Sequence, residues 1–328
     1  MDFHLSDDQR ALRAGVRELL SGRFPRERLR AAVDAYEAAG DGPVLDRALW
    51  RELADAGFFS LLLPEADGGA GLGLPEAVLV LEEAGRALLP GPLVAGVLLA
   101  GAVDGVAAGE RVAGLCDAAA VPALWEHPSD CDEVIVVAEH AAYRCAPEGL
   151  RTAPVRSVDP LTPLARLLDA PSGALSGAPY AADVPRLRRE AVLLTAAQQL
   201  GGAAHAVEAA VAYARQREQF GAPIGSFQAV KHLCAQMLVR VELARSAVYA
   251  ASVTEDPAEV SGAKLLADEA AVRNARDCLQ VHGGMGFTWE ADVHLLLKRA
   301  WLRAESWQSA AAGEEALAAA LADGHIAV

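Results

Sequence analysis

The sequence predicts a mainly helical protein with a small β domain between two helical domains. Hydrophobic residues make up 53% of the chain but aromatic residues only 5%, and most of the apolar content is Ala, Leu and Val. The stretches 189–216 and 227–253 contain no Pro and consist largely of helix-forming residues, which predicts two long helices. Short apolar runs, such as 133–137 and 155–158, are separated by Pro, Gly and Asp and are typical of strands.

The N-terminal helices begin at a capping box, Ser6-Asp7-Asp8-Gln9, in which Ser6 and Gln9 can satisfy each other's free backbone N–H groups. We expect this helix to end near Ser21. Further helices are expected near 26–39, 46–56 and 74–89, with a turn-rich loop at 61–69 before the last of them.

The C-terminal helices are expected to form an up-down bundle of four with short connections. Their expected limits are 185–216, 226–254, 257–282 and 290–322. In the first connection Gly221 and Pro223 end one helix, and the Ser226 hydroxyl is expected to cap the next. In the stretch Gln280–Phe287, three glycines allow a ligand or another backbone to approach closely. We therefore predict three domains: an N-terminal helical domain at 1–110, an abbreviated β domain at 111–182 and the four-helix bundle at 183–328.

Charge and cysteine content exclude several classes of partner. The formal net charge is −15 and the basic residues are scattered, so neither nucleic acid nor an anionic membrane is expected to bind. No apolar run reaches membrane-spanning length, which favours a cytoplasmic protein. The 5 cysteines are widely spaced without a Cys-x-x-Cys pair, so we expect reduced, buried thiols and no metal site or disulfide framework.

Two motifs resemble the C-terminal domain of the acyl-CoA dehydrogenase family. They are Arg-x-x-Phe-Gly-x-Pro-Ile-x-x-Phe-Gln at 217–228 and Gln-x-His-Gly-Gly-x-Gly-Phe at 280–287. The Leu-Pro-Glu-x-x-Gly-Gly loop at 63–69 and the Glu-x-Gly-Arg-x-Leu-x-Pro-Gly-Pro run at 83–92 resemble the family's N-terminal domain. Phe-Thr-Trp-Glu at 287–290 is similar to the actinobacterial branch, many of whose members act on steroid or lipid side chains. The resemblance implies an N-terminal helical domain, a middle β domain and a C-terminal four-helix bundle.

The middle domain departs from the family. A typical member carries a Thr-Glu-Pro…Gly-Ser-Asp segment that cradles the flavin ring and helps to bind acyl-CoA, and this chain has no counterpart. The predicted β domain is also much shorter than the family's, so it is expected to be abbreviated.

The catalytic base that the resemblance implies is also missing. In the family a flavin takes hydride from the acyl β-carbon while a Glu removes the α-proton. The commonest position of that Glu matches Trp307 and the alternative position matches Ala191, neither of which accepts a proton. Glu190, next to Ala191, is the leading candidate base, but it also fits as an ion-pair partner of the arginines around it; Glu305 is a weaker candidate. The sequence favours a chain without a base.

The residues that remain imply a shared FAD site. In the family, the matching residues reach across a subunit interface to the pyrophosphate and adenosine end of FAD; here they are Arg217, Phe220, Gln228, Gln280, Gly283 and Gly284. An arginine suits the pyrophosphate charge, and glycine backbone N–H groups can approach it closely.

Three hypotheses follow. The first is a subunit of a heteromeric α2β2 acyl-CoA dehydrogenase, whose full-length partner supplies the catalytic Glu. By family resemblance, the substrate is an acyl thioester of CoA or of an acyl-carrier protein, and the electron acceptor is an electron-transfer flavoprotein. The second is a self-sufficient homo-oligomeric dehydrogenase with Glu190 as base. The third is a non-enzymatic scaffold of the same fold.

Overall fold

The computed structural model describes residues 5–39, 42, 44–168 and 177–324. The chain divides into two compact units, which we call the bundle unit (1–17, 81–88 and 192–328) and the sheet unit (18–80 and 89–191). The three domains predicted from the sequence, 1–110, 111–182 and 183–328, are a different kind of division and stay a prediction. No helix of the described residues is long and apolar enough to cross a membrane.

The N-terminal helices match their predicted limits closely. The capping box is confirmed, since Ser6 N donates to Gln9 Oε1 at 3.0 Å and Gln9 N donates to Ser6 Oγ at 3.1 Å. The Asp46 carboxylate caps α3 by accepting from the Ala48 and Leu49 N–H groups. The helices are α1 (Asp7–Arg23), α2 (Arg26–Ala39), α3 (Arg47–Asp55), α4 (Leu74–Arg86) and α5 (Leu93–Leu99).

Two small sheets form the β part of the sheet unit. The four-stranded sheet has the order β1 (Ala113–Asp117), β3 (Glu133–Val137), β4 (Ala142–Cys145), β7 (Ala178–Tyr180). Its β1 and β3 are parallel and its other pairs are antiparallel. The three-stranded sheet has the order β2 (Leu124–Glu126), β6 (Leu164–Leu167), β5 (Thr152–Val155) and is antiparallel.

The strand prediction at 133–137 is confirmed and that at 155–158 is wrong. All five residues of β3 are buried, as a continuous apolar run requires. Near the second run the strand is β5, which ends at Val155, because polar side chains turn the chain after that residue. Ser157 Oγ accepts from Asp159 N at 3.2 Å, and Asp159 Oδ1 accepts from Leu161 N at 3.1 Å. Such local side-chain bonds compete with the strand ladder.

A buried His–Asp pair holds three loops of the sheet unit together. The Gly91 N–H donates to His127 Nε2 at 3.2 Å, so the proton of the neutral ring lies on Nδ1, which is 3.2 Å from Asp130 Oδ2. Asp130 Oδ1 also accepts from the N–H groups of Val44 and Leu45. Burial raises the pKa of Asp130, but the His127 ring and these N–H groups outweigh it, so the pKa is lowered overall.

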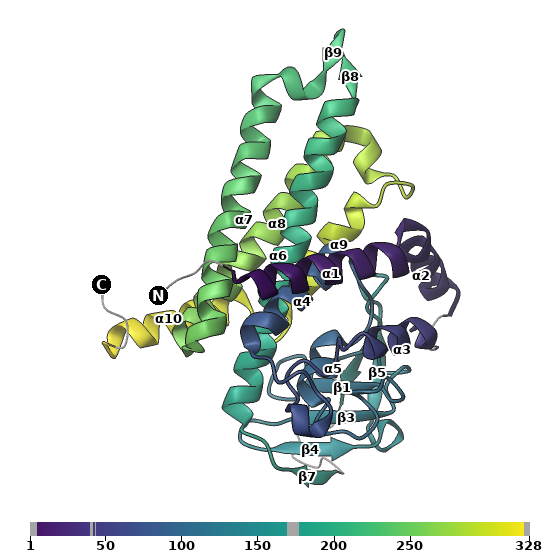
Figure 1. Ribbon diagram of the computed structural model, residues 1–328, viewed down its shortest axis with the longest axis vertical. Helices are drawn as coiled ribbons and strands as arrows, with labels where there is room; N and C mark the ends of the chain where they lie inside the picture. Colours follow the sequence, from purple (N-terminus) through teal and green to yellow (C-terminus); the bar gives the residue numbers. More distant parts are fainter. Residues whose placement is uncertain (1–4, 40–41, 43, 169–176, 325–328) are drawn as a thin grey trace. The chain divides into compact units, whose positions relative to one another are not determined.

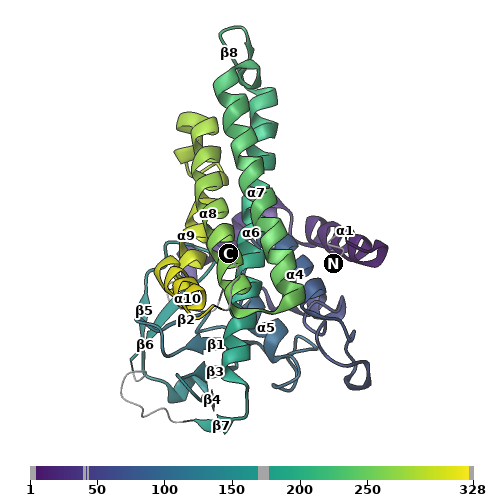
Figure 2. The same cartoon turned by 90° about the vertical axis from the view of Figure 1, so that its left-hand side faces the viewer.

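The bundle unit consists mainly of the C-terminal helices. They are α6 (Val184–Gln216, from residue 192 on), α7 (Gln228–Thr254), α8 (Pro257–His282), α9 (Val293–Glu305) and α10 (Ala310–Ala322). Figures 1 and 2 show α6, α7 and α8 side by side. The prediction of one helix at 290–322 is wrong, because Trp307 adopts φ 65° and Ser309 caps a new helix. Ser226 lies in a 3₁₀ turn, Ile224–Ser226, and does not cap α7.

Close packing of α4 on α6 accounts for two glycines. A Cβ on Gly201 would lie 1.8 Å from the Glu82 carbonyl oxygen, and one on Gly85 would lie 2.0 Å from that of Gln198. Since real Cβ atoms never come so close, any larger residue would push the two helices apart. Gly201 therefore stabilises the packing although it weakens the helix locally.

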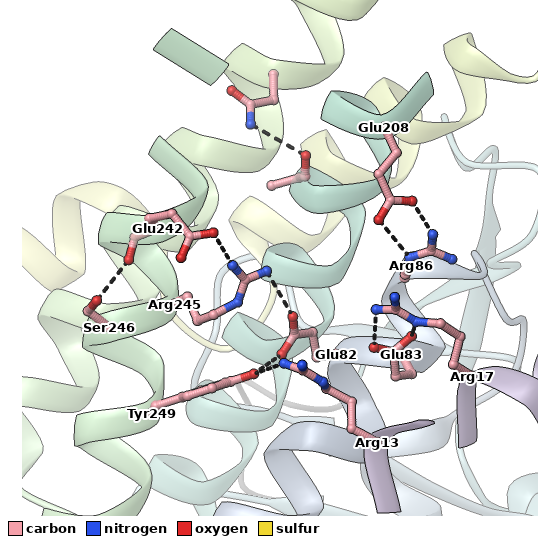
Figure 3. A network of polar contacts seen from close by, with 12 residues as sticks. Arg13, Arg17, Glu82, Glu83, Arg86, Glu208, Glu242, Arg245, Ser246 and Tyr249 are labelled. Carbon is pink, nitrogen blue, oxygen red and sulfur yellow. Dashed lines mark hydrogen bonds and ion pairs between the residues drawn. The ribbon is translucent and has the colours of Figure 1, made fainter. Parts of the chain in front are cut away.

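Two adjacent buried carboxylates tie α1 and α7 to the end of α4 (Figure 3). Glu83 accepts a bidentate pair from Arg17 at 2.6 and 2.8 Å. Glu82 accepts from the Tyr249 hydroxyl at 2.6 Å and from Arg245 at 3.3 Å. Both carboxylates are only 2% exposed, so their charges require these partners.

Candidate functional site

The first predicted motif forms a hairpin between α6 and α7. β8 (Glu218–Gln219) pairs antiparallel with β9 (Ala222–Pro223). The two residues between the strands both have positive φ, 55° at Phe220 and 77° at Gly221, as in a type I′ turn. In both views the hairpin lies at the tip of the α6–α7 pair, beyond the end of α8 (Figures 1 and 2).

Phe220 is a strained and exposed aromatic residue. Its side chain is 94% exposed, and its ring contacts that of Phe227 edge-on at a centroid distance of 6.1 Å. A bulky residue rarely adopts positive φ, and such strain concentrates at functional sites. Nothing inside the bundle unit needs this ring, so its position suits a contact with another molecule.

Arg217 and Gln228, at the two ends of the hairpin, present their side chains outward. Arg217 N donates to the Tyr213 carbonyl at 2.8 Å, which completes the last turn of α6. Both side chains are exposed. Within the part of the chain that the structure describes, neither one makes a hydrogen bond or an ion pair. The Arg217 charge is therefore available to an anion.

The second predicted motif ends α8 with open space beside its backbone. Gly283 adopts φ 60° and ψ −142°, and its N–H donates to the Gln280 carbonyl. A Cβ added to Gly283 or Gly284 would meet no atom within 4 Å. The Gln280 side chain is exposed as well. A ligand can therefore reach the backbone of both glycines.

A stacked pair, Tyr213 and His282, joins the two motifs. Their ring centroids are 4.1 Å apart at an interplanar angle of 25°. Tyr213 precedes Arg217 by one helical turn, and His282 directly precedes Gly283. The six predicted cofactor residues thus belong to two segments, and the Tyr213–His282 stack connects the helix ends from which these segments start. Sequence reasoning missed this pair, because the only signal was an aromatic residue near each motif.

Of the two candidate catalytic carboxylates, Glu190 forms an ion pair with a neighbouring arginine, as the sequence indicates. Glu190 lies in the second turn of α6, and its Oε1 accepts from Arg186 Nε at 2.7 Å. Its side chain is 12% exposed, so it faces solvent less than an ordinary surface ion pair. Glu305 is the exposed last residue of α9. Trp307 occupies the left-handed junction between α9 and α10 and presents no carboxylate.

The cysteines are free, and four of them are buried, as predicted; Cys234 is half-buried. Burial raises the pKa of the Cys278 thiol to about 12, so it stays protonated. The described residues contain no group of three His, Cys, Asp or Glu side chains placed to hold a metal ion.

Comparison with known proteins establishes the family. The model of the acyl-CoA dehydrogenase N-terminal domain matches residues 6–107, and that of the C-terminal domain matches residues 186–316. Acyl-CoA dehydrogenase IpdE2 of Mycobacterium tuberculosis is 37% identical over 87% of this chain and 89% of its own length. This chain belongs to the acyl-CoA dehydrogenase family. IpdE2 of Mycolicibacterium smegmatis is 32% identical over 90% of this chain and 93% of its own length.

Solved acyl-CoA dehydrogenases share the fold. A chain of the ChsE4–ChsE5 complex from Mycobacterium tuberculosis has a TM-score of 0.81 at 25% identity, covering 98% of this chain and 99% of that one. A chain of the Tcur3481–Tcur3483 steroid ACAD has a TM-score of 0.82 at 24% identity, covering 97% and 99%. The predicted mainly α fold with a small β domain is confirmed.

The acyl-CoA dehydrogenase family binds FAD, and the exposed motifs fit one end of that cofactor. Among the described residues Arg217 has no charged partner, so its charge can pair with a pyrophosphate, and the open backbone at Gly283 and Gly284 can come close to it. These groups suit the diphosphate rather than the flavin ring, because they offer charge and N–H donors instead of an apolar wall.

Proposed function

We propose that this chain is a subunit of a heteromeric acyl-CoA dehydrogenase and completes the FAD site of a full-length partner subunit. The partner supplies the flavin cradle and the catalytic Glu for α,β-dehydrogenation of an acyl thioester. The assembly is an α2β2 heterotetramer that passes electrons to an electron-transfer flavoprotein. One observation carries the proposal: the side chains and the glycine backbone of the six predicted cofactor residues are open to a ligand from outside the chain.

The chain's own contribution is to bind and orient. When bound, FAD accepts the hydride from the acyl β-carbon. Arg217 would neutralise charge on the diphosphate, and the Gly284 N–H would donate to it, whereas the Gly283 N–H is already bonded to the Gln280 carbonyl. Phe220 and Gln228 extend the contact at the hairpin. The α-proton leaves to a carboxylate of the partner, since Trp307 stands where the base most commonly lies in the family.

An exposed apolar surface supports assembly. On α7, Leu238, Val239 and Leu243 are 50%, 57% and 57% exposed, while Met237 and Val241 on the same helix are buried. Large apolar side chains that gather on an exposed helix surface are typical of a contact with another protein. Relatives in the solved ChsE4–ChsE5 complex have the same fold, which agrees with a hetero-oligomer.

The direct test is to purify the chain alone and together with a full-length acyl-CoA dehydrogenase subunit. We expect the isolated chain to be nearly colourless, because the segment that encloses the flavin ring is absent. Copurification is expected to give one complex with stoichiometric flavin and dehydrogenase activity. A stable yellow homo-oligomer that turns over acyl-CoA by itself would support Glu190 as a base instead.

Arg217→Ala tests the shared site within that complex. Loss of a charge-assisted pair to phosphate is worth roughly 1.5–3 kcal/mol, so we expect about a ten- to hundredfold weaker FAD affinity. Arg215→Ala is the matched control, because Arg215 is also exposed and lies two residues earlier in α6. If Arg217→Ala lowers the melting temperature and leaves FAD affinity unchanged, Arg217 has only a structural role.

A further inference from the structure

The Tyr213–His282 stack is the structural link between the two cofactor motifs. The rings lie 4.1 Å apart and nearly parallel, one from the last full turn of α6 and the other from the last residue of α8. Aromatic pairs at this spacing attract each other beyond the apolar area they bury. The stack therefore fixes the spacing between the ends of these two helices.

A hydrogen bond to the backbone of α8 holds the His282 ring in one orientation. Its Nδ1 lies 2.8 Å from the Cys278 carbonyl oxygen, and since that oxygen can only accept, Nδ1 carries the proton. The carbonyl belongs to the preceding turn of α8, so the bond ties the ring to its own helix. His282 is thus fixed against α8, and the stack transmits that position to Tyr213 on α6.

Each ring is adjacent to a group that meets the diphosphate in the proposed function. Arg217 N bonds to the Tyr213 carbonyl, so a shift of Tyr213 moves the start of the hairpin. Gly283 directly follows His282, and its N–H donates to the Gln280 carbonyl of the same helix end, so a shift of His282 moves the start of the second motif. The distance between the Arg217 charge and the Gly283–Gly284 backbone depends on the stack.

We propose that Tyr213 and His282 are positioning residues that hold Arg217 and the Gly283–Gly284 backbone at the separation that a diphosphate needs. Neither ring needs to touch FAD. The proposal rests on the proposed function, because it assumes that the two motifs bind the diphosphate of FAD together. It adds that the affinity of this chain for the cofactor depends on the spacing between the two helix ends as well as on the motifs.

A double-mutant cycle between Tyr213 and Arg217 tests the proposal. FAD affinity of the assembled complex is measured for Tyr213→Ala, Arg217→Ala and the double variant, and ADP affinity is measured by calorimetry on each free chain as a readout without the flavin ring. We expect Tyr213→Ala to weaken FAD and ADP binding roughly two- to tenfold, the range that an aromatic pair supports. In the Arg217→Ala background, the same change is expected to have almost no further effect, because the position of a missing charge no longer matters.

Conservative variants separate stacking from simple packing. Tyr213→Phe keeps the ring and is expected to bind FAD normally, whereas Tyr213→Leu fills space without stacking and is expected to behave like Tyr213→Ala. His282→Ala is expected to show the same coupling to Arg217. Trp301→Ala, which removes a 40% exposed aromatic residue of α9, is the control and is expected to leave affinity unchanged.

The outcomes distinguish this proposal from the function on which it rests. If Tyr213→Ala and Tyr213→Leu weaken binding by the same factor with and without Arg217, the stack acts independently and the positioning role is wrong. If both variants leave FAD and ADP affinity unchanged while Arg217→Ala weakens it, the proposal fails and the shared site stands. If Arg217→Ala has no effect on either ligand, the proposed function itself is contradicted.

Discussion

At the scale of single residues, Glu190 decides whether this chain does chemistry. It is paired with Arg186 in the second turn of α6. We expect Glu190→Gln to leave turnover of the assembled complex within about twofold, since Gln keeps volume and helix propensity, whereas loss of a general base typically reduces rates ~10²–10⁴-fold.

Flavin content and assembly are measured on the same Glu190→Gln preparations, so that a drop in turnover can be assigned to chemistry. Arg186→Gln is the matched control, because it removes the same ion pair from the other side. A hundredfold loss with Glu190→Gln alone, at unchanged flavin content, would identify Glu190 as the base and this chain as self-sufficient.

Asp130 makes the sheet unit sensitive to acid. Its folded-state pKa is lowered, since the His127 ring and backbone N–H groups outweigh burial. A carboxylate of this kind stabilises the fold above its unfolded pKa and loses that contribution as pH falls through the folded pKa. We expect the melting temperature to fall as pH drops below about 4, where an ordinary Asp begins to protonate.

Asp130→Asn is expected to lower the melting temperature at pH 7 and to flatten its dependence on pH between about 5 and 3. Asp67→Asn changes an exposed residue of the same unit and is expected to leave the melting curve as it is. An unaltered pH dependence in Asp130→Asn would show that the buried pair with His127 does not control acid unfolding.

A sequence motif can indicate a site residue, whereas a residue that owes its role to tertiary packing carries no such local signal. Arg217 and Gly283 are predicted because the motifs that contain them resemble those of the acyl-CoA dehydrogenase family. Tyr213 and His282 were not, because each is an ordinary half-buried residue until α6 and α8 are placed together. Sequence spacing cannot show that two rings from different helices stack.

At the scale of elements, local signals set most helix limits. The range 257–282 was predicted correctly, because Asp256 caps α8, Pro257 occupies its first turn and Gly283 ends it. The break between α9 and α10 carries no Gly or Pro and was missed. Its cause is tertiary: buried Lys264 of α8 donates to the carbonyl oxygens of Arg303 at 3.0 Å and Gln308 at 3.4 Å, on either side of the break.

Lys264 is therefore expected to control the stability of the α8–α9–α10 region. The side chain is 1% exposed and pairs with Asp268, which also accepts from Gln199 at 2.8 Å. Burial lowers the pKa of Lys264 and raises that of Asp268, each against the attraction of the other. Breaking such a pair leaves one buried charge, so we expect Lys264→Met to reduce the free energy of unfolding by about 3–5 kcal/mol in urea titrations.

Two variants make the Lys264 measurement specific. Lys231→Met removes an exposed lysine of α7 and is expected to change the unfolding free energy by less than about 0.5 kcal/mol. Lys264→Met combined with Asp268→Leu removes both charges and is expected to recover much of the loss. A double variant as unstable as Lys264→Met alone would indicate that the contacts to the α9–α10 break, rather than the ion pair, provide the stability.

At the scale of the whole molecule, the sequence predicted the class of the fold but not its connections. Composition and helix length indicated a helical protein with a β segment, whereas strand order depends on pairing between distant residues. The parallel pairing of β1 with β3, across residues 118–132, is an example. The close approach of α4 to α6 at Gly201 is another, because a glycine inside a helix indicates local weakness rather than a neighbour.

The last prediction concerns the assembly. Leu243 is 57% exposed on the outer face of α7, so Leu243→Asp is expected to leave the melting temperature of the isolated chain unchanged. If the proposed partner covers this face, the same change buries an unpaired carboxylate, and we expect at least a roughly tenfold weaker association by ultracentrifugation. Val253→Asp is the matched control, since Val253 is 55% exposed on the same helix but lies roughly 15 Å further along its axis than Leu243. Equal association of both variants with the partner would show that the apolar face of α7 is not part of the interface, whereas a loss confined to Leu243→Asp would locate the partner on the helix that follows the hairpin of Arg217 and Phe220.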